Sequence, residues 1–227
     1  MLGKDLILKN PLKRLAYKSE DILSNGGFGA ILARAGVGKT ALMVQFALNA
    51  LLKRQNVLHV SLNDSVSKVS LWYDEVLRNM ATHYQTDQIQ LLKDHILKHR
   101  LIMTFKAADF NVQKFEERLT DLKEQRIFFP NMILVDGLIF DEAVKKTLFR
   151  LGAHAKSNAI RVWFAVRTHR HERPALNGIP TQLAEIDDLF EMVIQLNPEG
   201  KDVRLKVLKG MPVGVAACNG GFFYFRF

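Results

Sequence analysis

The chain has 227 residues, of which 48% are hydrophobic and 24% are charged, and this composition excludes a fibrous or largely disordered protein. The length allows one α/β domain with a full core and is too short for two comfortable ones. The net charge of +9 would attract nucleic acid, an acidic protein or an anionic membrane surface, but it also fits a solvated surface without such a partner.

The chain begins with a basic segment without clear periodicity, and residues 1–20 are therefore predicted to form an N-terminal arm before one domain at 21–227. The arm lacks the apolar stretch and cleavage site of a signal peptide, and no apolar run is long enough to span a bilayer. Cys218 is the single cysteine, which excludes an internal disulfide and fits a reducing compartment. We expect a cytoplasmic protein without membrane insertion.

Strands and helices are predicted to alternate along most of the chain. Apolar runs predict strands at 28–32, 57–62, 101–105, 132–135 and 162–166. Apolar residues at helical spacing predict helices at 39–52, 66–80, 89–97, 112–122 and 144–155. This alternation predicts right-handed crossovers and a parallel sheet, and the continuous apolar runs indicate strands that are covered on both faces.

The pattern changes after Glu191, where three apolar segments follow one another without a long helix between them. Strands are predicted at 192–196, 203–208 and 222–225, with turns at 197–200 and near 210–212. The predicted fold class is therefore α/β, with a mainly parallel central sheet flanked by helices and antiparallel strands added at its C-terminal edge.

The loop after the first strand carries the most specific motif. Residues 33–40 fit the phosphate-loop pattern, with Ala33 in place of the first glycine. Gly36 and Gly38 let the backbone N–H groups face phosphate oxygens, and the following helix directs its positive end to the same anion. Lys39 would reach the β- and γ-phosphates, and the Thr40 hydroxyl would bind Mg²⁺. The predicted nucleotide-binding residues are Ala33, Arg34, Ala35, Gly36, Val37, Gly38, Lys39, Thr40 and Ala41.

Asp136 supports this interpretation because it ends the apolar strand 132–135. Alone, an aspartate at the end of a strand has a structural explanation. Together with a phosphate loop it is the usual companion that holds Mg²⁺ through water. The predicted metal residues are thus Thr40 and Asp136, and the predicted cofactors are ATP and Mg²⁺.

The strand 57–62 ends in Ser61-Leu62-Asn63-Asp64-Ser65, and with the loop Ala33-Arg34…Gly38-Lys39-Thr40-Ala41 it resembles the RecA-type ATPase core. The resemblance is greatest to replicative hexameric helicases and KaiC-like proteins and runs from about Phe28 to about Lys209. It implies a RecA-like P-loop NTPase fold for the domain. In that family the second strand ends in a glutamate that activates the attacking water.

Further positions are interpreted only through this resemblance. Arg167 stands at the strand end where the family carries a glutamine that senses the γ-phosphate, and Lys209 stands where it supplies a basic finger to a neighbour's ATP. The segment 186–193 is similar to the family's acidic turn into its next strand. The resemblance therefore also implies a homo-oligomer.

The chain departs from the family at catalytic positions. Asn63 replaces the glutamate, and an amide cannot take a proton from water. Asp64 follows it and is either a general base or a structural turn residue. Arg167 replaces the glutamine, and Met211 replaces the arginine that follows the finger lysine. The candidate catalytic residues are Asp64, Lys39 and Arg167, and these departures favour binding over turnover.

Nucleic acid is a candidate partner because basic side chains cluster after the strand 162–166. In RecA-like proteins the loop at this place often faces DNA, and cations there would neutralise phosphates. A solvated loop, or arginines that serve bound ATP, explains the same cluster. Its members are Arg167, His169, Arg170, His171 and Arg173.

These features lead us to expect an ATP-binding RecA/KaiC-like protein, a slow Mg²⁺-dependent ATPase that acts on DNA or a protein partner. The alternative is a regulatory nucleotide-binding module with degenerate catalysis. A partition-type ATPase is a third hypothesis, since Arg34 stands where those proteins carry an extra lysine. Their second strand ends in Asp-x-Asp, however, which Ser61-Leu62-Asn63 does not match.

Overall fold

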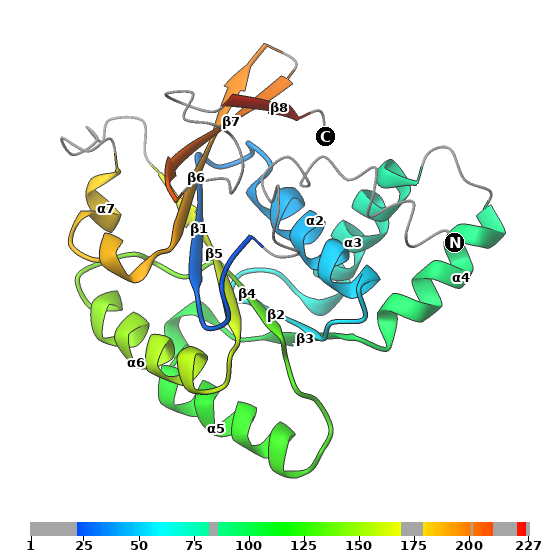
Figure 1. Cartoon of the computed structure of the whole chain (residues 1–227), viewed down its shortest axis with the longest axis horizontal. Coiled ribbons are helices and arrows are strands. Elements are labelled where there is room, and N and C mark those ends of the chain that lie inside the picture. Colours follow the sequence, from blue (N-terminus) through cyan, green and yellow to red (C-terminus); the bar gives the residue numbers. More distant parts are fainter. Residues whose placement is uncertain (1–21, 82–85, 169–178, 201, 211–221, 226–227) are drawn as a thin grey trace.

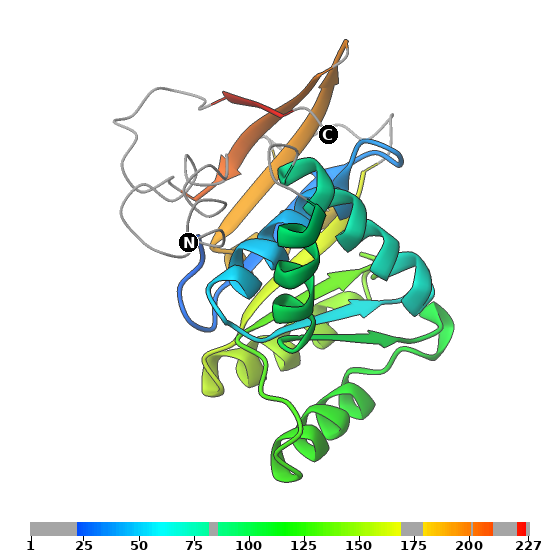
Figure 2. The same cartoon turned by 90° about the vertical axis from the view of Figure 1, so that its right-hand side faces the viewer.

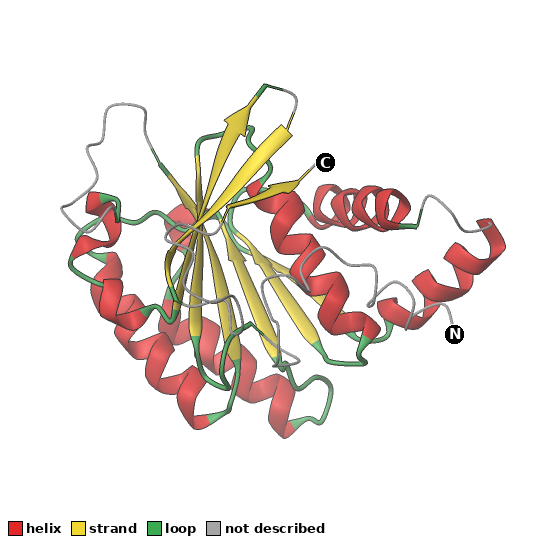
Figure 3. Ribbon diagram, turned by 45° about the horizontal axis from the view of Figure 1, so that its top comes forward, coloured by secondary structure: helices red, strands yellow, loops and turns green. Residues whose placement is uncertain are grey.

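A twisted sheet with helices on both faces forms the centre of the molecule (Figures 1 and 3). The computed structural model describes residues 22–81, 86–168, 179–200, 202–210 and 222–225. Within them the strands are β1 (Phe28–Ala33), β2 (Val57–Ser61), β3 (Arg100–Thr104), β4 (Met132–Asp136), β5 (Arg161–Arg167), β6 (Met192–Glu199), β7 (Asp202–Lys209) and β8 (Phe222–Phe225). They form one sheet of order β3-β2-β4-β5-β1-β6-β7-β8. The predicted α/β class with a mainly parallel sheet is confirmed.

The strands from β3 to β6 in this order are parallel, and β7 and β8 are antiparallel to their neighbours. Because parallel strands end at the same edge, the carboxyl ends of β1, β2, β4 and β5 lie together. Strand β5 lies between β1 and β4, and its last residue, Arg167, pairs with Ala33. The segments that follow these strands therefore converge on one edge of the sheet.

Two sets of helices cover the two faces of the sheet, as Figures 1 and 2 show. One face carries α2 (Lys39–Leu52), α3 (Val66–Met80) and α4 (Thr86–Leu97). The other carries α5 (Val112–Glu124), α6 (Val144–Ser157), α7 (Thr181–Ala184) and the 3₁₀ turns η2 (Ala107–Asp109) and η3 (Asp187–Leu189). Helix α2 is apolar almost all round because it lies between the sheet and α3.

Strand β1 shows why both faces of the sheet are apolar. Ala30 and Leu32 belong to the core under α5 and α6, whereas Ile31 belongs to the core under α2. This alternation follows from the period of two in a strand. Position 29 requires glycine because of packing, since a Cβ atom there would lie 2.4 Å from the ring of Trp163. The indole therefore lies on the glycine, and a larger residue at position 29 would displace it.

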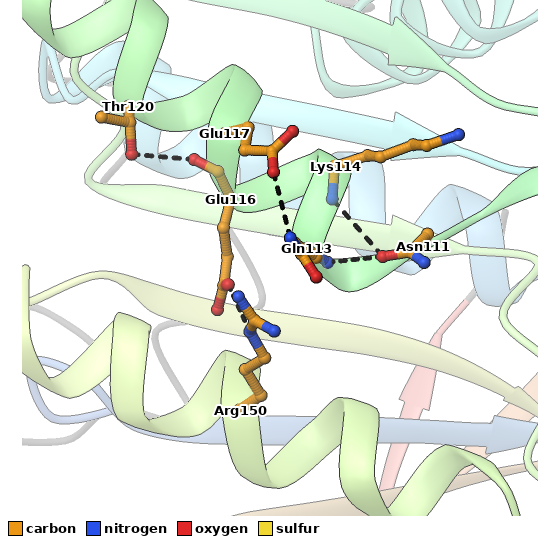
Figure 4. A network of polar contacts seen from close by, with 7 residues as sticks. All are labelled: Asn111, Gln113, Lys114, Glu116, Glu117, Thr120 and Arg150. Carbon is orange, nitrogen blue, oxygen red and sulfur yellow. Dashed lines mark hydrogen bonds and ion pairs between the residues drawn. The ribbon is translucent and has the colours of Figure 1, made fainter.

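Polar contacts cap the start of α5 and join α5 to α6 (Figure 4). The Asn111 side-chain oxygen accepts hydrogen bonds from the backbone N–H groups of Gln113 and Lys114, which caps the start of α5. Arg150 of α6 donates to the Glu116 carboxylate of α5. Exposed ion pairs contribute little stability, so the buried apolar residues under α5 and α6 hold the two helices in place.

The C-terminal strands differ from the sequence expectation in two ways. Strand β6 pairs in parallel with β1, so antiparallel pairing begins only at β7. The turn predicted at 197–200 lies later in the chain, because β6 continues through Pro198 to Glu199 and Pro198 pairs with Val203, so that only Gly200 of the predicted turn lies outside the strand. Gly200 follows with φ of +62°, a conformation that suits glycine in a tight turn.

The N-terminal arm, Cys218, Met211 and the basic cluster beyond Thr168 lie outside the described residues. The short helix α7 and the 3₁₀ turn η2 were not predicted, whereas η3 lies within the segment 186–193, where an acidic turn was expected. No helix in the described part of the chain is both long enough and apolar enough to cross a membrane.

Candidate functional site

The loop between β1 and α2 is shaped by two glycines. Gly36 has φ of +76° and Gly38 has φ of +103°, backbone conformations that residues with a Cβ atom rarely adopt. Gly38 is also the N-cap residue of α2, and no side chain caps the helix. The backbone donors of the first turn therefore remain available to a ligand, at the end of the helix that attracts anions. Nothing lies within 4 Å of the place of a Cβ atom on Gly36, so the loop is open on that side.

The side chain of Lys39 folds back onto the loop that precedes it. Its Nζ atom donates to the carbonyl oxygens of Ala33 and Arg34, both at 2.9 Å. An ammonium group has three donors, so one remains for a ligand. Burial lowers the pKa of Lys39, the charge of Arg167 lowers it further, and the carboxylate of Asp136 opposes both effects.

Thr40 and Asp136 are in direct contact. The Thr40 hydroxyl donates to Asp136 Oδ2 at 2.8 Å, which brings the first turn of α2 to the end of β4. Burial raises the pKa of Asp136, while the hydrogen bond from Thr40 and the charge of Lys39 counteract that rise. A hydroxyl and a carboxylate are hard oxygen ligands of the kind that Mg²⁺ prefers.

The described residues contain no cluster of three or more His, Cys, Asp and Glu side chains that could hold a metal ion. A Mg²⁺ site of this kind needs only one or two protein ligands, with phosphates and water completing the shell. The pair of Thr40 and Asp136 is such a set, and the residues present therefore fit the expected ion.

A cleft of about 570 Å³ opens at the carboxyl edge of the sheet beside this pair. The predicted catalytic and metal residues all line it, namely Lys39, Thr40, Asp64, Asp136 and Arg167. Its size is that of an ordinary small-molecule site. The structure thus brings together residues from α2 and from the ends of β2, β4 and β5, which are far apart in the sequence.

The other predicted binding residues have different places. Ala35 lines the cleft, and Ala33 and Arg34 contribute the carbonyl groups that hold Lys39. Val37 is half-buried at the turn of the loop. Ala41 is buried within α2 and packs in the core, so its side chain does not face the cleft.

Asp64 and Asn63 form the wall of the cleft that follows β2. The Asp64 backbone N–H donates to the Ser61 hydroxyl at 3.0 Å, and its Oδ1 atom accepts from Lys68 Nζ at 2.7 Å. The Asn63 amide lies on Gly137, where a Cβ atom would come within 2.4 Å of Nδ2. The carboxylate of Asp64 faces the cleft with one oxygen already in an ion pair.

Arg167 ends β5 and is exposed in the cleft. Its guanidinium group makes no hydrogen bond or ion pair with another residue of the part that the structure describes, whereas its backbone pairs with Ala33 of β1. Lys209, the expected finger, has a partner in its own chain. Its Nζ atom donates to the Asp187 carbonyl oxygen at 2.6 Å and lies 3.9 Å from Oδ2 of the same residue.

Part of the cleft was not predicted. Leu138, Ile139 and Phe140 continue from Asp136 along its wall, and Gln182 reaches it from α7. The first three could have been found, since residues that follow a strand ending in a site carboxylate lie at the same edge. Gln182 had no comparable signal, because α7 is only four residues long. No protein-family model matches the chain, and no curated protein matches its sequence significantly.

Proposed function

We propose that this chain is a RecA-like P-loop protein that binds ATP with Mg²⁺, hydrolyses it slowly, and uses the nucleotide to control a DNA or protein partner. The observation that carries the proposal is the convergence of Lys39, Thr40 and Asp136 on one cleft at the end of the sheet. The positive-φ glycines 36 and 38 and the uncapped helix α2 add a backbone cradle for phosphates.

Each group has a role in this proposal. The free donor of Lys39 and the backbone N–H groups of the loop hold the β- and γ-phosphates. Thr40 and Asp136 would hold Mg²⁺, which when bound offsets the negative charge of the phosphates. Among the described residues that line the cleft, Asp64 and Asp136 carry the carboxylates. Because Asp136 serves the metal, Asp64 is the group that would accept a proton from the attacking water.

Slow turnover follows from the surroundings of Asp64. One of its carboxylate oxygens accepts from Lys68, and Asn63 places an amide rather than a carboxylate beside Gly137. General-base assistance contributes about a hundredfold or more to such reactions. These two features also favour the second candidate function, a regulatory module that binds ATP without turnover.

The proposed partners depend on the overall charge and on the family resemblance, and not on contacts in the cleft. The net charge of +9 and the basic residues that begin at Arg167 favour nucleic acid or an acidic protein. The RecA resemblance adds a homo-oligomer, and the single cysteine fits the cytoplasm.

The binding assignment is tested with Lys39→Ala. The change removes the cation that meets the phosphates, so Mg²⁺ and ATP should raise the melting temperature of the variant much less than that of the parent. The reason is that the stabilisation by a ligand grows with the logarithm of its concentration divided by its dissociation constant, so weaker binding gives a smaller rise. Differential scanning fluorimetry across ATP concentrations gives the measurement.

The matched control is Lys114→Ala, which removes an equal charge from the exposed surface of α5 (Figure 4). Its stabilisation by ATP should equal that of the parent. An equal response of Lys39→Ala and the parent would exclude the loop as the phosphate site.

A further inference from the structure

A second cavity, of about 620 Å³, opens at the edge of the sheet opposite to the cleft. It lies where the chain enters β4 and β5, between the last turns of α5 and α6 (Figure 1). Asp136 and Arg167 line the cleft at the other ends of the same two strands. The cavity is therefore separate from the proposed nucleotide site, and its ligand has to be inferred from its own lining.

The end of α5 forms one side of the cavity. The Ile127 N–H donates to the Leu122 carbonyl oxygen at 2.9 Å, and Arg126 before it has φ of +56°. Glycine is usual at this place of a helix end, because a Cβ atom is unfavourable there. An arginine occupies the position instead, and its side chain lines the cavity.

The apolar part of the cavity is held in place by the chain around it. Leu119 and Ile160 line it and are buried, whereas Phe129, in the loop before β4, lines it and is 47% exposed. The Phe129 carbonyl oxygen accepts from Asn56 Nδ2 at 3.1 Å, and the buried Phe128 anchors the same loop in the core under α5 and α6. The apolar wall is thus formed without a ligand, as is usual for small-molecule sites.

Cationic side chains lie beside this apolar wall. Lys123 Nζ donates to Asn158 Oδ1 at 3.0 Å, which leaves two of its three donors for a ligand. The guanidinium group of Arg126 makes no hydrogen bond or ion pair with another residue in the described ranges. His154 adds an imidazole from α6, and among the described residues of the lining only Glu124 carries a carboxylate. The lining therefore has two permanent positive charges against one negative charge.

The ends of the helices explain only part of this arrangement. Cations are favoured at helix C-termini, which accounts for Lys123 and Arg126 taken alone. It does not account for an open apolar wall beside them, with an aromatic ring that is about half exposed. An apolar wall with a few polar groups at its margin is typical of a site that binds and orients a small molecule.

We propose that this cavity binds a small amphipathic anion, a molecule with an aromatic or branched apolar body and one carboxylate or sulfonate group. The body packs on Leu119, Phe129 and Ile160, and the anionic group pairs with Lys123 and Arg126. The volume of the cavity is that of an ordinary small-molecule site, and the excess of cations selects an anion over a neutral ligand. The inference goes beyond the proposed function and does not depend on it.

The test is a fluorescence titration of the full chain with two probes. Anilinonaphthalene sulfonate is an apolar dye with one sulfonate, and phenylnaphthylamine has the same rings without the charge. The sulfonate dye should bind at a single site on each chain. Phe129→Ala should weaken both probes, because it removes part of the apolar wall. Lys123→Gln combined with Arg126→Gln should weaken only the charged dye, by about tenfold, since each exposed charge pair contributes up to about a factor of five.

Matched controls remove the same groups elsewhere. Lys114→Gln combined with Arg118→Gln removes two cations from exposed positions of α5 outside the cavity, and Phe149→Ala removes an exposed ring from α6. Both should bind the two probes as the parent does. ATP with Mg²⁺ should not displace the dye, because the cleft lies at the opposite edge of the sheet. All substituted positions are exposed, so the variants should keep the melting temperature of the parent, and a loss of binding then reports on the cavity.

Several results would overturn the inference. A parent that does not bind the dye would exclude the site, and binding that survives Phe129→Ala would place the dye elsewhere. An equal loss of both probes in the variant without Lys123 and Arg126 would remove the preference for an anion. Displacement by ATP would assign the dye to the cleft, and release of the dye as chains associate at high concentration would assign the cavity to a contact between copies.

Discussion

At the scale of single residues, we expect the wall formed by Asn63 and Asp64 to set the rate of the proposed hydrolysis. Asp64 offers one free carboxylate oxygen, because Lys68 lies four residues later on α3 and binds the other. Position 63 has no such partner, since the residue four positions later is Ser67. A carboxylate at position 63 would therefore face the cleft without a competing lysine.

Two substitutions test this account of the chemistry. Asp64→Asn removes the remaining proton acceptor and should lower ATP turnover by about a hundredfold while ATP binding stays intact. Asn63→Glu adds an unpaired carboxylate and should raise turnover above that of the parent. The measurement is steady-state phosphate release, with binding checked separately by calorimetry.

The outcomes separate the two candidate functions. A parent with almost no hydrolysis and no gain from Asn63→Glu would support the regulatory module. Brisk hydrolysis that survives Asp64→Asn would show that a different carboxylate acts as the base.

Some features of the site could be predicted from the sequence, and others required the tertiary structure. Lys39 and Thr40 could be predicted because a phosphate loop is a local motif with fixed spacing. The pairing of Asp64 with Lys68 could also have been read from its helical spacing. The hydrogen bond from Thr40 to Asp136 joins residues 96 positions apart, so only the tertiary structure reveals it.

At the scale of elements, β2, α3 and β3 meet around a buried polar group. His59 is fully buried in β2, and its Nδ1 atom lies 3.2 Å from the Tyr73 hydroxyl of α3. The guanidinium of Arg100 on β3 lies 4.6 Å from the centre of the Tyr73 ring. Burial lowers the pKa of His59 to about 4, and the charge of Arg100 acts in the same direction, against a weaker opposite effect of Asp64.

Stability should therefore fall in mildly acidic solution. The ordinary pKa of histidine is 6.5, so between pH 6.5 and about 4 the unfolded chain takes up a proton at His59 while the folded chain does not. The unfolding free energy decreases as the pH falls through this window, by about 3 kcal/mol at 1.4 kcal/mol for each pKa unit. Urea unfolding of the parent and of His59→Gln at a series of pH values measures the effect.

The glutamine variant cannot titrate, so its stability should change less between pH 6.5 and 4. His95→Gln, at a half-buried position on α4, should keep the slope of the parent. Equal slopes for the parent and His59→Gln would show that His59 is not the group responsible.

Most elements were predictable because their apolar periodicity is strong. Helix α2 has the predicted bounds, and strands β1 to β5 differ from the prediction by at most a residue or so at each end. The turn after β6 was misplaced because Pro198 and Gly200 favour a turn by composition. Pro198 has no backbone N–H, yet its place in the pairing of β6 with β7 keeps it in the strand.

At the scale of the whole molecule, strand order decides what the cleft can do. Alternating strands and helices predicted a parallel sheet but not its order, because many orders satisfy the same connections. The insertion of β5 between β1 and β4 is what places Arg167 beside Lys39 and Asp136. The local motif was sufficient to predict a glycine turn between β1 and α2, whereas the composition of the complete cleft required the fold.

At the same scale, the net charge makes it necessary to separate non-specific DNA binding from DNA binding that depends on the nucleotide. We expect a protein of charge +9 to bind DNA to some extent in dilute salt, because releasing counterions from phosphates is favourable for a basic surface. Binding alone therefore does not distinguish a nucleic-acid ATPase from a basic protein with another partner. The informative quantity is the change in DNA affinity when ATP and Mg²⁺ are bound, since coupling between two sites is reciprocal.

We expect ATP with Mg²⁺ to change the affinity for single-stranded DNA by about fivefold or more, the usual range of coupling between two sites. DNA should in turn change the affinity for ATP by the same factor. Fluorescence anisotropy of a labelled oligonucleotide, measured over a series of salt concentrations with and without ATP, gives both the coupling and the salt dependence. In Lys39→Ala the effect of ATP should vanish, because the nucleotide no longer binds. DNA binding that weakens steeply with salt but is the same with and without ATP would reflect surface charge alone, and the partner controlled by the nucleotide would then be a protein.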